Sequence, residues 1–203
     1  MRRSLLAATL LLAACAQVGP GDRVGRAVAG MERLRGVRFA IDARSVASGA
    51  RSDGDLALGY HATGELVPPD RLRLALTEPV PATLVIVGSR AWRDGRPVPP
   101  APLRTLAHPQ ALLEQAREPG TASASFVGLG FARGKLTMRY RIDRRERGVM
   151  EVELGLLDDL IRRQSFTVTE AVAPDGSGLA SVKTSYVVEY WDFGLPLDIG
   201  EPN

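Results

Sequence analysis

The sequence predicts an α+β domain built around a long antiparallel sheet. Apolar and polar residues alternate in many short segments that follow one another at roughly ten-residue spacing, with turn residues between them. Alternation with a period of two is typical of strands with one buried and one solvated face. Three other segments carry apolar residues at helical spacing, and we expect these helices to cover the apolar face of the sheet.

The first expected helix covers residues 24–34, and Gly36 follows its last apolar residue. The second covers residues 109–117, with a proline in its first turn. The third covers residues 149–163 and has the clearest apolar stripe: Val152, Leu156, Leu157, Leu160 and Ile161. Residues 122–131 are small and apolar, and they fit either a helix or a strand.

The expected strands share the alternating pattern and are bounded by turn residues such as those at 52–55, 68–70 and 174–178. They cover residues 37–44, 56–60, 71–77, 83–87, 91–93, 135–142, 165–172 and 179–190. Residues 96–102 contain four prolines and are expected to form an irregular loop.

The N-terminal residues are typical of an exported lipoprotein. A short basic start precedes an apolar run at residues 5–12, and Leu-Ala-Ala then leads into Cys15, the only cysteine of the chain. This resembles the bacterial lipobox, in which the cysteine is acylated and the chain is cut before it. We therefore expect a signal peptide at 1–14, a lipidated Cys15 with a flexible tether at 15–23, and one domain at 24–203. Two acyl chains would form a stable membrane anchor.

Three other interpretations of the N-terminus explain these residues less well. A buried core helix would not normally lie at the extreme N-terminus behind two arginines. An ordinary signal peptide with an incidental cysteine does not explain why Cys15 falls where a lipobox needs it. An uncleaved membrane helix would need about 20 apolar residues, and the run is shorter than that.

Composition argues against nucleic-acid binding and against disulfides. Basic residues alternate with acidic ones along the chain, and aromatic residues make up only 5%. An acylated Cys15 leaves no thiol for a disulfide, so burial and hydrogen bonds must hold the fold.

Catalytic signatures are sparse, so we expect no enzyme, no metal and no cofactor. His61 and His108 are the only histidines, and neither lies in a metal-ligand spacing. The alternative is an envelope enzyme that acts on polysaccharide, which would need a pair of carboxylates drawn from Asp42, Asp55 or Glu65.

Several short motifs carry a resemblance to a known family. The chain ends its last expected strand with YWDFGLPLDI at residues 190–199, and further matches lie at 54–56, 69–72 and 85–88, the last before a short strand with Trp92. In these motifs and in its order of elements, the chain resembles bacterial lipoproteins of the LppX/LprG type. These proteins share a fold with the LolA and LolB carriers and with the sensor domain of RseB.

The resemblance implies an open antiparallel half-barrel with helices over its concave face and an apolar cavity for acyl chains. The lining that it implies from strands is Phe39, Ile41, Leu56, Leu58, Leu72, Leu74, Leu76, Ile86, Leu136, Met138 and Tyr140. The lining that it implies from helices is Leu112, Leu113, Leu156, Leu160 and Ile161. Since each buried methylene contributes about 0.8 kcal/mol, one long acyl chain would gain roughly 10 kcal/mol before costs.

The expected function is a membrane-anchored lipoprotein that binds lipid or acyl chains for carriage or sensing in the cell envelope. The alternative is a non-catalytic interaction or RseB-like sensor module with a protein partner. In that alternative the same apolar residues form an ordinary filled core.

Overall fold

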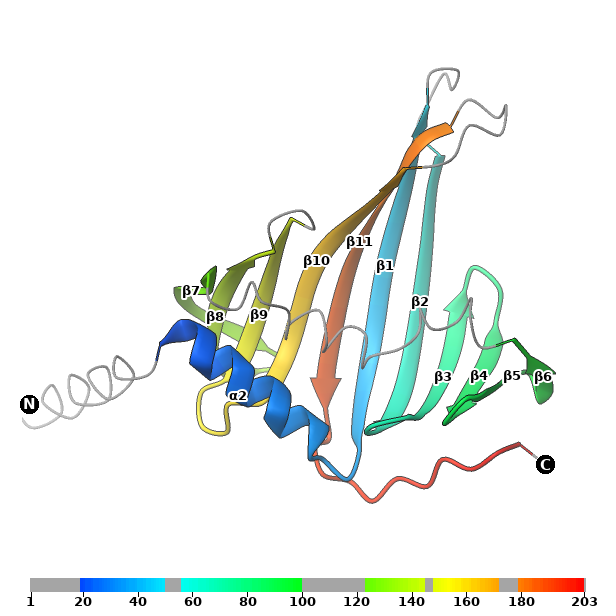
Figure 1. Cartoon of the computed structure of the whole chain (residues 1–203), viewed down its shortest axis with the longest axis horizontal. Coiled ribbons are helices and arrows are strands. Elements are labelled where there is room, and N and C mark those ends of the chain that lie inside the picture. The colour runs from blue at the N-terminus through cyan, green and yellow to red at the C-terminus, as the bar shows by residue number, and fades with distance from the viewer. Residues whose placement is uncertain (1–18, 50–55, 100–122, 145–147, 172–178, 203) are drawn as a thin grey trace, which may run out of the picture.

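The computed structural model describes residues 19–49, 56–99, 123–144, 148–171 and 179–202 (Figure 1). These residues form one helix, α2 (Pro20–Glu32), and one eleven-stranded sheet. The strands are β1 (Val37–Gly49), β2 (Leu56–Val67), β3 (Arg71–Glu78), β4 (Ala82–Val87), β5 (Arg90–Arg93), β6 (Arg96–Val98), β7 (Ser125–Ala132), β8 (Lys135–Asp143), β9 (Val149–Gly155), β10 (Ile161–Ala171) and β11 (Leu179–Trp191).

The sheet is antiparallel throughout and open. Its order is β6-β5-β4-β3-β2-β1-β11-β10-β9-β8-β7, so β1 and β11 pair at the centre and β6 and β7 form the two edges. Figure 1 shows that the long central strands rise above the shorter flanking strands. The predicted open antiparallel sheet is therefore confirmed.

Helix α2 lies on the concave face against β7, β9 and β10. It begins at Pro20, because proline suits the first turn of a helix, and it buries Val24, Ala27, Val28 and Met31 against the sheet. The helix expected from residue 24 thus exists, although it starts four residues earlier and ends at Glu32.

The main core lies between α2 and the concave face. Alternate residues of β1, from Val37 to Ala43, are buried, and Phe39 and Tyr190 pack with their ring centroids 6.3 Å apart. A Cβ at Gly64 would lie 2.5 Å from the Cζ atom of Phe39. Glycine at this position therefore lets the Phe39 ring lie flat over β2.

The helix expected at residues 149–163 is wrong. The chain instead forms β9, a turn and the start of β10, and Met150, Val152 and Leu154 are all fully buried on one face. The apolar residues that mimic a helical stripe lie partly in the turn, where Leu157 is 99% exposed. Asp158 accepts a hydrogen bond from the backbone N–H of Leu160, and such a local bond favours a turn over a helix.

The expected helical cover of the concave face is also wrong for the part of the chain that the structure describes. There α2 is the only helix, and it reaches only one half of the face. The helix expected at 109–117, like Cys15 and the signal segment, lies outside the described residues. No helix among the described residues is long and apolar enough to cross a membrane.

One segment that the sequence left open is now assigned, and another differs from its expected structure. The ambiguous stretch at 122–131 is resolved as strand β7, which begins at Ser125. The start of the expected proline-rich loop forms the short edge strand β6, where a proline is tolerated because one side of the strand needs no partner.

The last residues of the chain pack on the outer side of the sheet. Ile199 is fully buried in a second, small cluster with Val85 and Trp92. Near the start of this C-terminal segment, the backbone N–H of Gly194 donates a hydrogen bond to the carbonyl of Gly36 at 2.8 Å. Figure 1 shows the segment running past the lower ends of the strands from β11 toward β5.

Candidate functional site

The concave face carries an apolar pocket of about 360 Å³. Its lining comes from six strands and the β3–β4 turn: Ser45, Tyr60, Leu74, Leu76, Pro79, Ala82, Leu84, Arg93, Thr184 and Tyr186. The pattern of alternation explains why these residues meet, since each strand directs every second side chain to this face.

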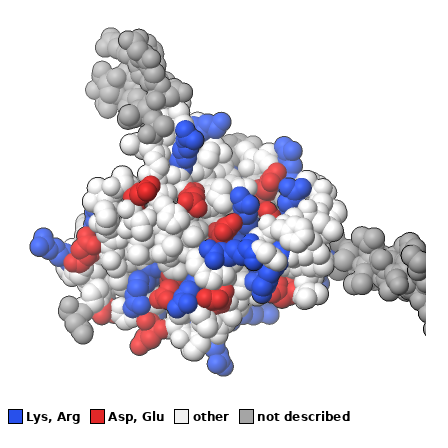
Figure 2. Space-filling model, turned by 180° about the vertical axis from the view of Figure 1, so that it is seen from behind, with Lys and Arg blue, Asp and Glu red and all other residues white. Residues whose placement is uncertain are grey.

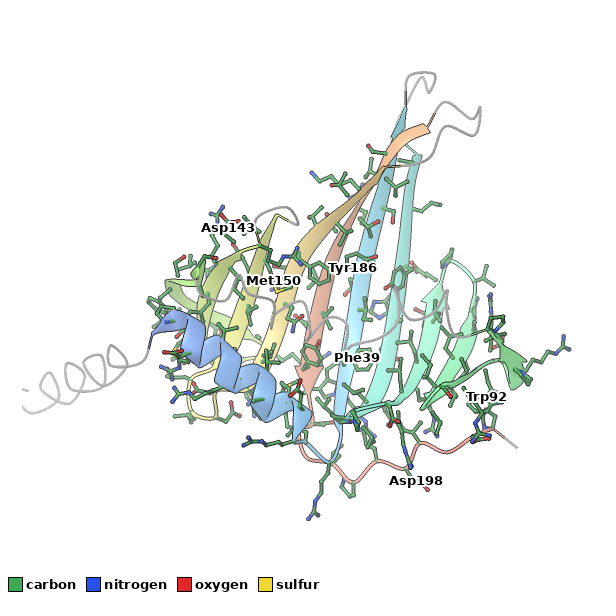
Figure 3. The ribbon with its side chains drawn as sticks, viewed as in Figure 1. Phe39, Trp92, Asp143, Met150, Tyr186 and Asp198 are labelled. Carbon is green, nitrogen blue, oxygen red and sulfur yellow. The ribbon has the colours of Figure 1, made fainter. Side chains whose placement is uncertain are left out.

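The pocket lies on the half of the concave face that α2 does not reach. Helix α2 packs on β7, β9 and β10, whereas the pocket lies over β1 to β5 and β11. Figure 3 shows Tyr186 on β11 above the helix, while Phe39 lies lower, beside its C-terminal end. Among the described residues, no helix lies over the pocket.

The lining has few polar groups, and some of them already have a partner within the protein. The hydroxyl oxygens of Ser45 and Thr184 are hydrogen-bonded to each other at 2.9 Å across the β1–β11 pair. Arg93 has a half-exposed guanidinium, whose Nε is 3.9 Å from a carboxylate oxygen of Asp94. The apolar surface thus has a cationic group at one side.

Tyr60 and Tyr186 bring phenol groups to the pocket. Burial, and then the neighbouring Tyr186, raise the pKa of the Tyr60 hydroxyl well above its ordinary range. Tyr60 therefore stays protonated at physiological pH, and its hydroxyl remains a hydrogen-bond donor. Tyr186 also stacks on Phe166, with ring centroids 5.0 Å apart. This stacking fixes one wall of the pocket.

The structure places the sequence-predicted lining residues in four groups. Two of them line the pocket: Leu74 and Leu76. Seven are buried in the main core: Phe39, Ile41, Leu72, Ile86, Met138, Tyr140 and Ile161. Leu156 and Leu160 pack half-buried against that core, from the β9–β10 turn and not from a helix, whereas Leu58 and Leu136 are exposed.

The remaining predicted residues are not placed. Leu56 begins β2, but its side chain is outside the description, and Leu112 and Leu113 lie outside the described residues altogether. Sequence reasoning missed the other eight lining residues, both small or polar ones such as Ser45, Ala82 and Thr184 and large ones such as Leu84 and Tyr186. The alternation does show that Ser45 points to the concave face, because it follows Phe39 and Ile41 at even spacing. A criterion that selects only apolar residues nevertheless leaves out serine and threonine.

The carboxylates considered for catalysis do not form a pair. The Nδ1 atom of His61 lies 2.6 Å from a carboxylate oxygen of Asp42, and Glu65 is held between Arg38 at 3.3 Å and Arg73 at 3.2 Å. Asp42 on β1 pairs with His61 on β2, and Glu65 lies four residues further along β2. The two carboxylate residues are therefore about 13 Å apart along the strand direction. Asp55 lies outside the described residues.

These carboxylates belong to a charged outer surface. In Figure 2, which views the molecule from behind, acidic and basic side chains are interleaved across the middle of this face. Among the described residues, no group of three or more His, Cys, Asp or Glu side chains is placed to hold a metal ion.

Two side chains of the core, Gln164 and Tyr190, have buried polar atoms without a hydrogen-bond partner. Gln164 is fully buried, and neither atom of its amide is hydrogen-bonded. The hydroxyl of Tyr190, on the neighbouring strand, is also buried without a partner, and burial raises the pKa of Tyr190 well above its ordinary range. An unsatisfied buried polar group destabilises a fold.

Comparison with known proteins finds similarity only among solved structures. No family model matches the chain, and no curated protein matches its sequence significantly. A LolA superfamily protein from Nitrosomonas europaea is 10% identical, with a TM-score of 0.38, over 91% of this chain and 96% of that one. A putative outer membrane lipoprotein-sorting protein domain from Vibrio parahaemolyticus is 10% identical, with a TM-score of 0.29, over 86% and 92%.

The complex of MucA and MucB from Pseudomonas aeruginosa is also similar. The identity is 14%, the TM-score is 0.38, and the match covers 84% of this chain and 55% of that one. The chain thus spans about half the length of that neighbour. These TM-scores are all below 0.5, so the fold is established by the strand order and register given above and not by these neighbours.

Proposed function

We propose that this chain is an exported, membrane-anchored protein that binds the acyl chain of a lipid or acylated ligand in the concave pocket, for carriage or sensing in the cell envelope and without catalysis. The observation that carries the proposal is the apolar pocket over β1 to β5 and β11, on the half of the concave face that α2 leaves uncovered. The resemblance to LppX/LprG lipoproteins supports the same ligand class.

The size of the pocket suits one acyl chain or a small amphiphile. Ligand sites commonly span about 300–1,000 Å³, and this one, at about 360 Å³, is near the lower limit. A chain with about ten buried methylenes would gain about 8 kcal/mol, against association costs of about 4–15 kcal/mol. Burial alone therefore gives weak binding, and a polar contact from the headgroup would be needed for tight binding.

Arg93 is positioned to make that contact. Its guanidinium is part of the lining yet half exposed, so a phosphate or carboxylate at the end of an acyl chain could reach it without burying the charge. The proposed ligand therefore has an apolar chain and an anionic head.

The membrane anchor in this proposal is an acylated Cys15. It is supported by the basic start, the apolar run and the Leu-Ala-Ala before this single cysteine. Two acyl chains there would hold the domain at a membrane surface and keep it near lipid donors or acceptors.

The test is uptake of a fluorescent fatty-acyl probe by the full chain carrying Cys15→Ser, which cannot be acylated. Leu76→Trp adds a bulky ring at a half-buried lining position and is expected to reduce probe affinity at least tenfold, about 1.4 kcal/mol. Ala75→Trp is the matched control, because Ala75 is the preceding residue of β3 and its exposed side chain points to the other face. Equal binding by both variants would contradict the proposal.

A protein-interaction module is the second candidate, and one observation favours it. Seven of the residues expected to line a cavity are buried in a packed core among the described residues. If the chain takes up no acyl probe and Leu76→Trp unfolds it, the pocket is part of that core. The function would then be interaction with an envelope protein partner.

A further inference from the structure

An apolar rim lies at the β7 end of the sheet, away from the pocket. Its members are large apolar side chains that the fold leaves exposed: Leu129, Phe131, Leu136 and Leu157, with exposed fractions of 56%, 70%, 37% and 99%. Single exposed apolar residues are ordinary on protein surfaces, but a cluster of them indicates contact with another apolar phase.

Strand pairing and one turn bring these four residues to the same place. Phe131 is opposite Leu136 in the β7–β8 pair, and Leu129 lies two residues before Phe131 on the same face. The backbone N–H of Leu156 donates to the carbonyl of Leu136 at 3.4 Å. This bond places the β9–β10 turn, with Leu157, beside the end of the β7–β8 hairpin.

The two edges of the sheet differ in how they are protected. Edge strand β6 has only three residues, and Arg96 and Pro97 are two of them. Edge strand β7 has eight residues, SFVGLGFA, with neither a charge nor a proline. Proteins usually protect exposed edges with charges, prolines or short strands, and among the described strands β7 has none of these devices.

The start of α2 lies at this rim. The Nε atom of Arg23 donates to Asp159 of the β9–β10 turn at 2.7 Å, and α2 also packs on β7. Figure 1 shows the first turn of α2 next to β7 and β8. Cys15 precedes Pro20 by five residues, which reach at most about 18 Å when fully extended.

We propose that the apolar rim rests on the lipid bilayer that holds the Cys15 anchor. This inference depends on the acylation of Cys15 in the proposed function. Acyl chains attached at Cys15 must enter the bilayer within about 18 Å of the start of α2, so the membrane surface lies close to the exposed Phe131 and Leu157. Amphipathic surfaces bind a bilayer through buried apolar area, and this rim supplies that area.

Charges around the rim are compatible with this contact. Asp158 is bonded to Arg162, and Asp159 to Arg23, so the turn would bring no unpaired carboxylate to the bilayer. Lys135, at the start of β8, is exposed and would face anionic headgroups.

The experiment places a fluorescent probe on the rim of the full, acylated chain. Alkylation consumes the thiol of Cys15, so Phe131→Cys creates the only free thiol, and a maleimide carrying nitrobenzoxadiazole labels it alone. Leu58→Cys is the matched control. Leu58 is about as exposed as Leu129, but it lies on β2, six positions away from β7 in the strand order of the sheet. Leu129→Cys gives a second rim position.

The labelled proteins are reconstituted into vesicles of phosphatidylethanolamine and phosphatidylglycerol. We expect the emission of the probe at positions 131 and 129 to rise about twofold and shift to the blue, because the acyl boundary is drier than water, with no change at position 58. Bound protein whose rim probes still report water would overturn the inference, as would an equal shift at position 58.

Two further outcomes distinguish a missing anchor from a rim that does not touch the bilayer. Protein that does not remain with the vesicles, and whose native thiol reacts with maleimide, would show that Cys15 is not acylated; the proposed anchor would then fail, and the inference with it. A blue shift without vesicles that grows with protein concentration would mean that the β7 edges of two copies pair, and would also overturn it.

Discussion

Ser45 and Thr184 face each other across β1 and β11, and their hydroxyl oxygens are 2.9 Å apart in the lining of the pocket. One hydroxyl donates to the other, so part of the polarity of this pocket wall is used within the protein. The pairing depends on the register of two strands that are far apart in the sequence.

Replacing both hydroxyls should strengthen acyl binding. The double variant Ser45→Ala, Thr184→Val removes both partners together, so we expect a change of less than about 1 kcal/mol in the free energy of unfolding and a several-fold gain in probe affinity. Thr184→Val alone leaves the Ser45 hydroxyl without this partner and should be less stable than the double variant. Probe titration and urea unfolding measure the two effects, and weaker binding by the double variant would argue against an acyl ligand.

Gly64 should not tolerate a side chain. A Cβ there would lie 2.5 Å from the ring of Phe39 and 2.8 Å from the backbone oxygen of Arg73, and the ring is fully buried. We expect Gly64→Ala to lower the free energy of unfolding by about 1–3 kcal/mol.

Gly59→Ala is the control for this prediction on the same strand. The nearest atom to its Cβ would be the carbonyl oxygen of Ala43 at 3.7 Å, an ordinary contact. We expect little change in the urea midpoint for Gly59→Ala. If both variants lose the same stability, the cost belongs to β2 in general and not to the contact with Phe39.

Gln164→Leu should stabilise the protein. The buried amide has no protein partner, so removing it relieves a desolvation cost, and we expect a gain of about 1 kcal/mol in the free energy of unfolding. Tyr190→Phe, which removes a buried hydroxyl that also has no hydrogen-bond partner, should act in the same direction. Calorimetry of both variants tests this, and a clear loss of stability would show that the amide is hydrogen-bonded in solution.

Cys15→Ser should release the protein from membranes. Without the thiol no acyl chain can be attached at residue 15, so the anchor of the proposed function is lost and we expect the variant in the soluble fraction. Fractionation by centrifugation with the unaltered chain as reference gives the result. A variant that stays with the membrane would refute acylation as the main anchor.

Alternation in the sequence predicted the inward residues where a strand has one face in the main core. Val37, Phe39, Ile41 and Ala43 are buried as expected, although Ala40 on the other face is buried as well, and Leu72 and Leu74 on β3 are also buried as expected. The pattern failed at residues 149–163, because Leu156, Leu157, Leu160 and Ile161 imitate a helical stripe across a turn. Pairing of β9 with β8 and β10 decides that segment, and such pairing is not local.

The candidate site was only partly readable for a related reason. Phe39 and Leu76 both point to the concave face, as their phase predicts, yet Phe39 packs in the main core with Met31 of α2 while Leu76 lines the pocket. Phase reveals the face of a sheet, but it does not reveal which part of that face a helix covers.

The amino-acid sequence by itself determined the lipobox-like start, the strand periodicity and the residues that point inward, because these depend on chemistry and spacing within a few residues. Only the tertiary structure decided which inward residues form core and which line the pocket, and that β7 is an edge among the described strands and lies beside the start of α2. Those outcomes depend on strand order and on the position of one helix, and both result from contacts between residues far apart in the chain.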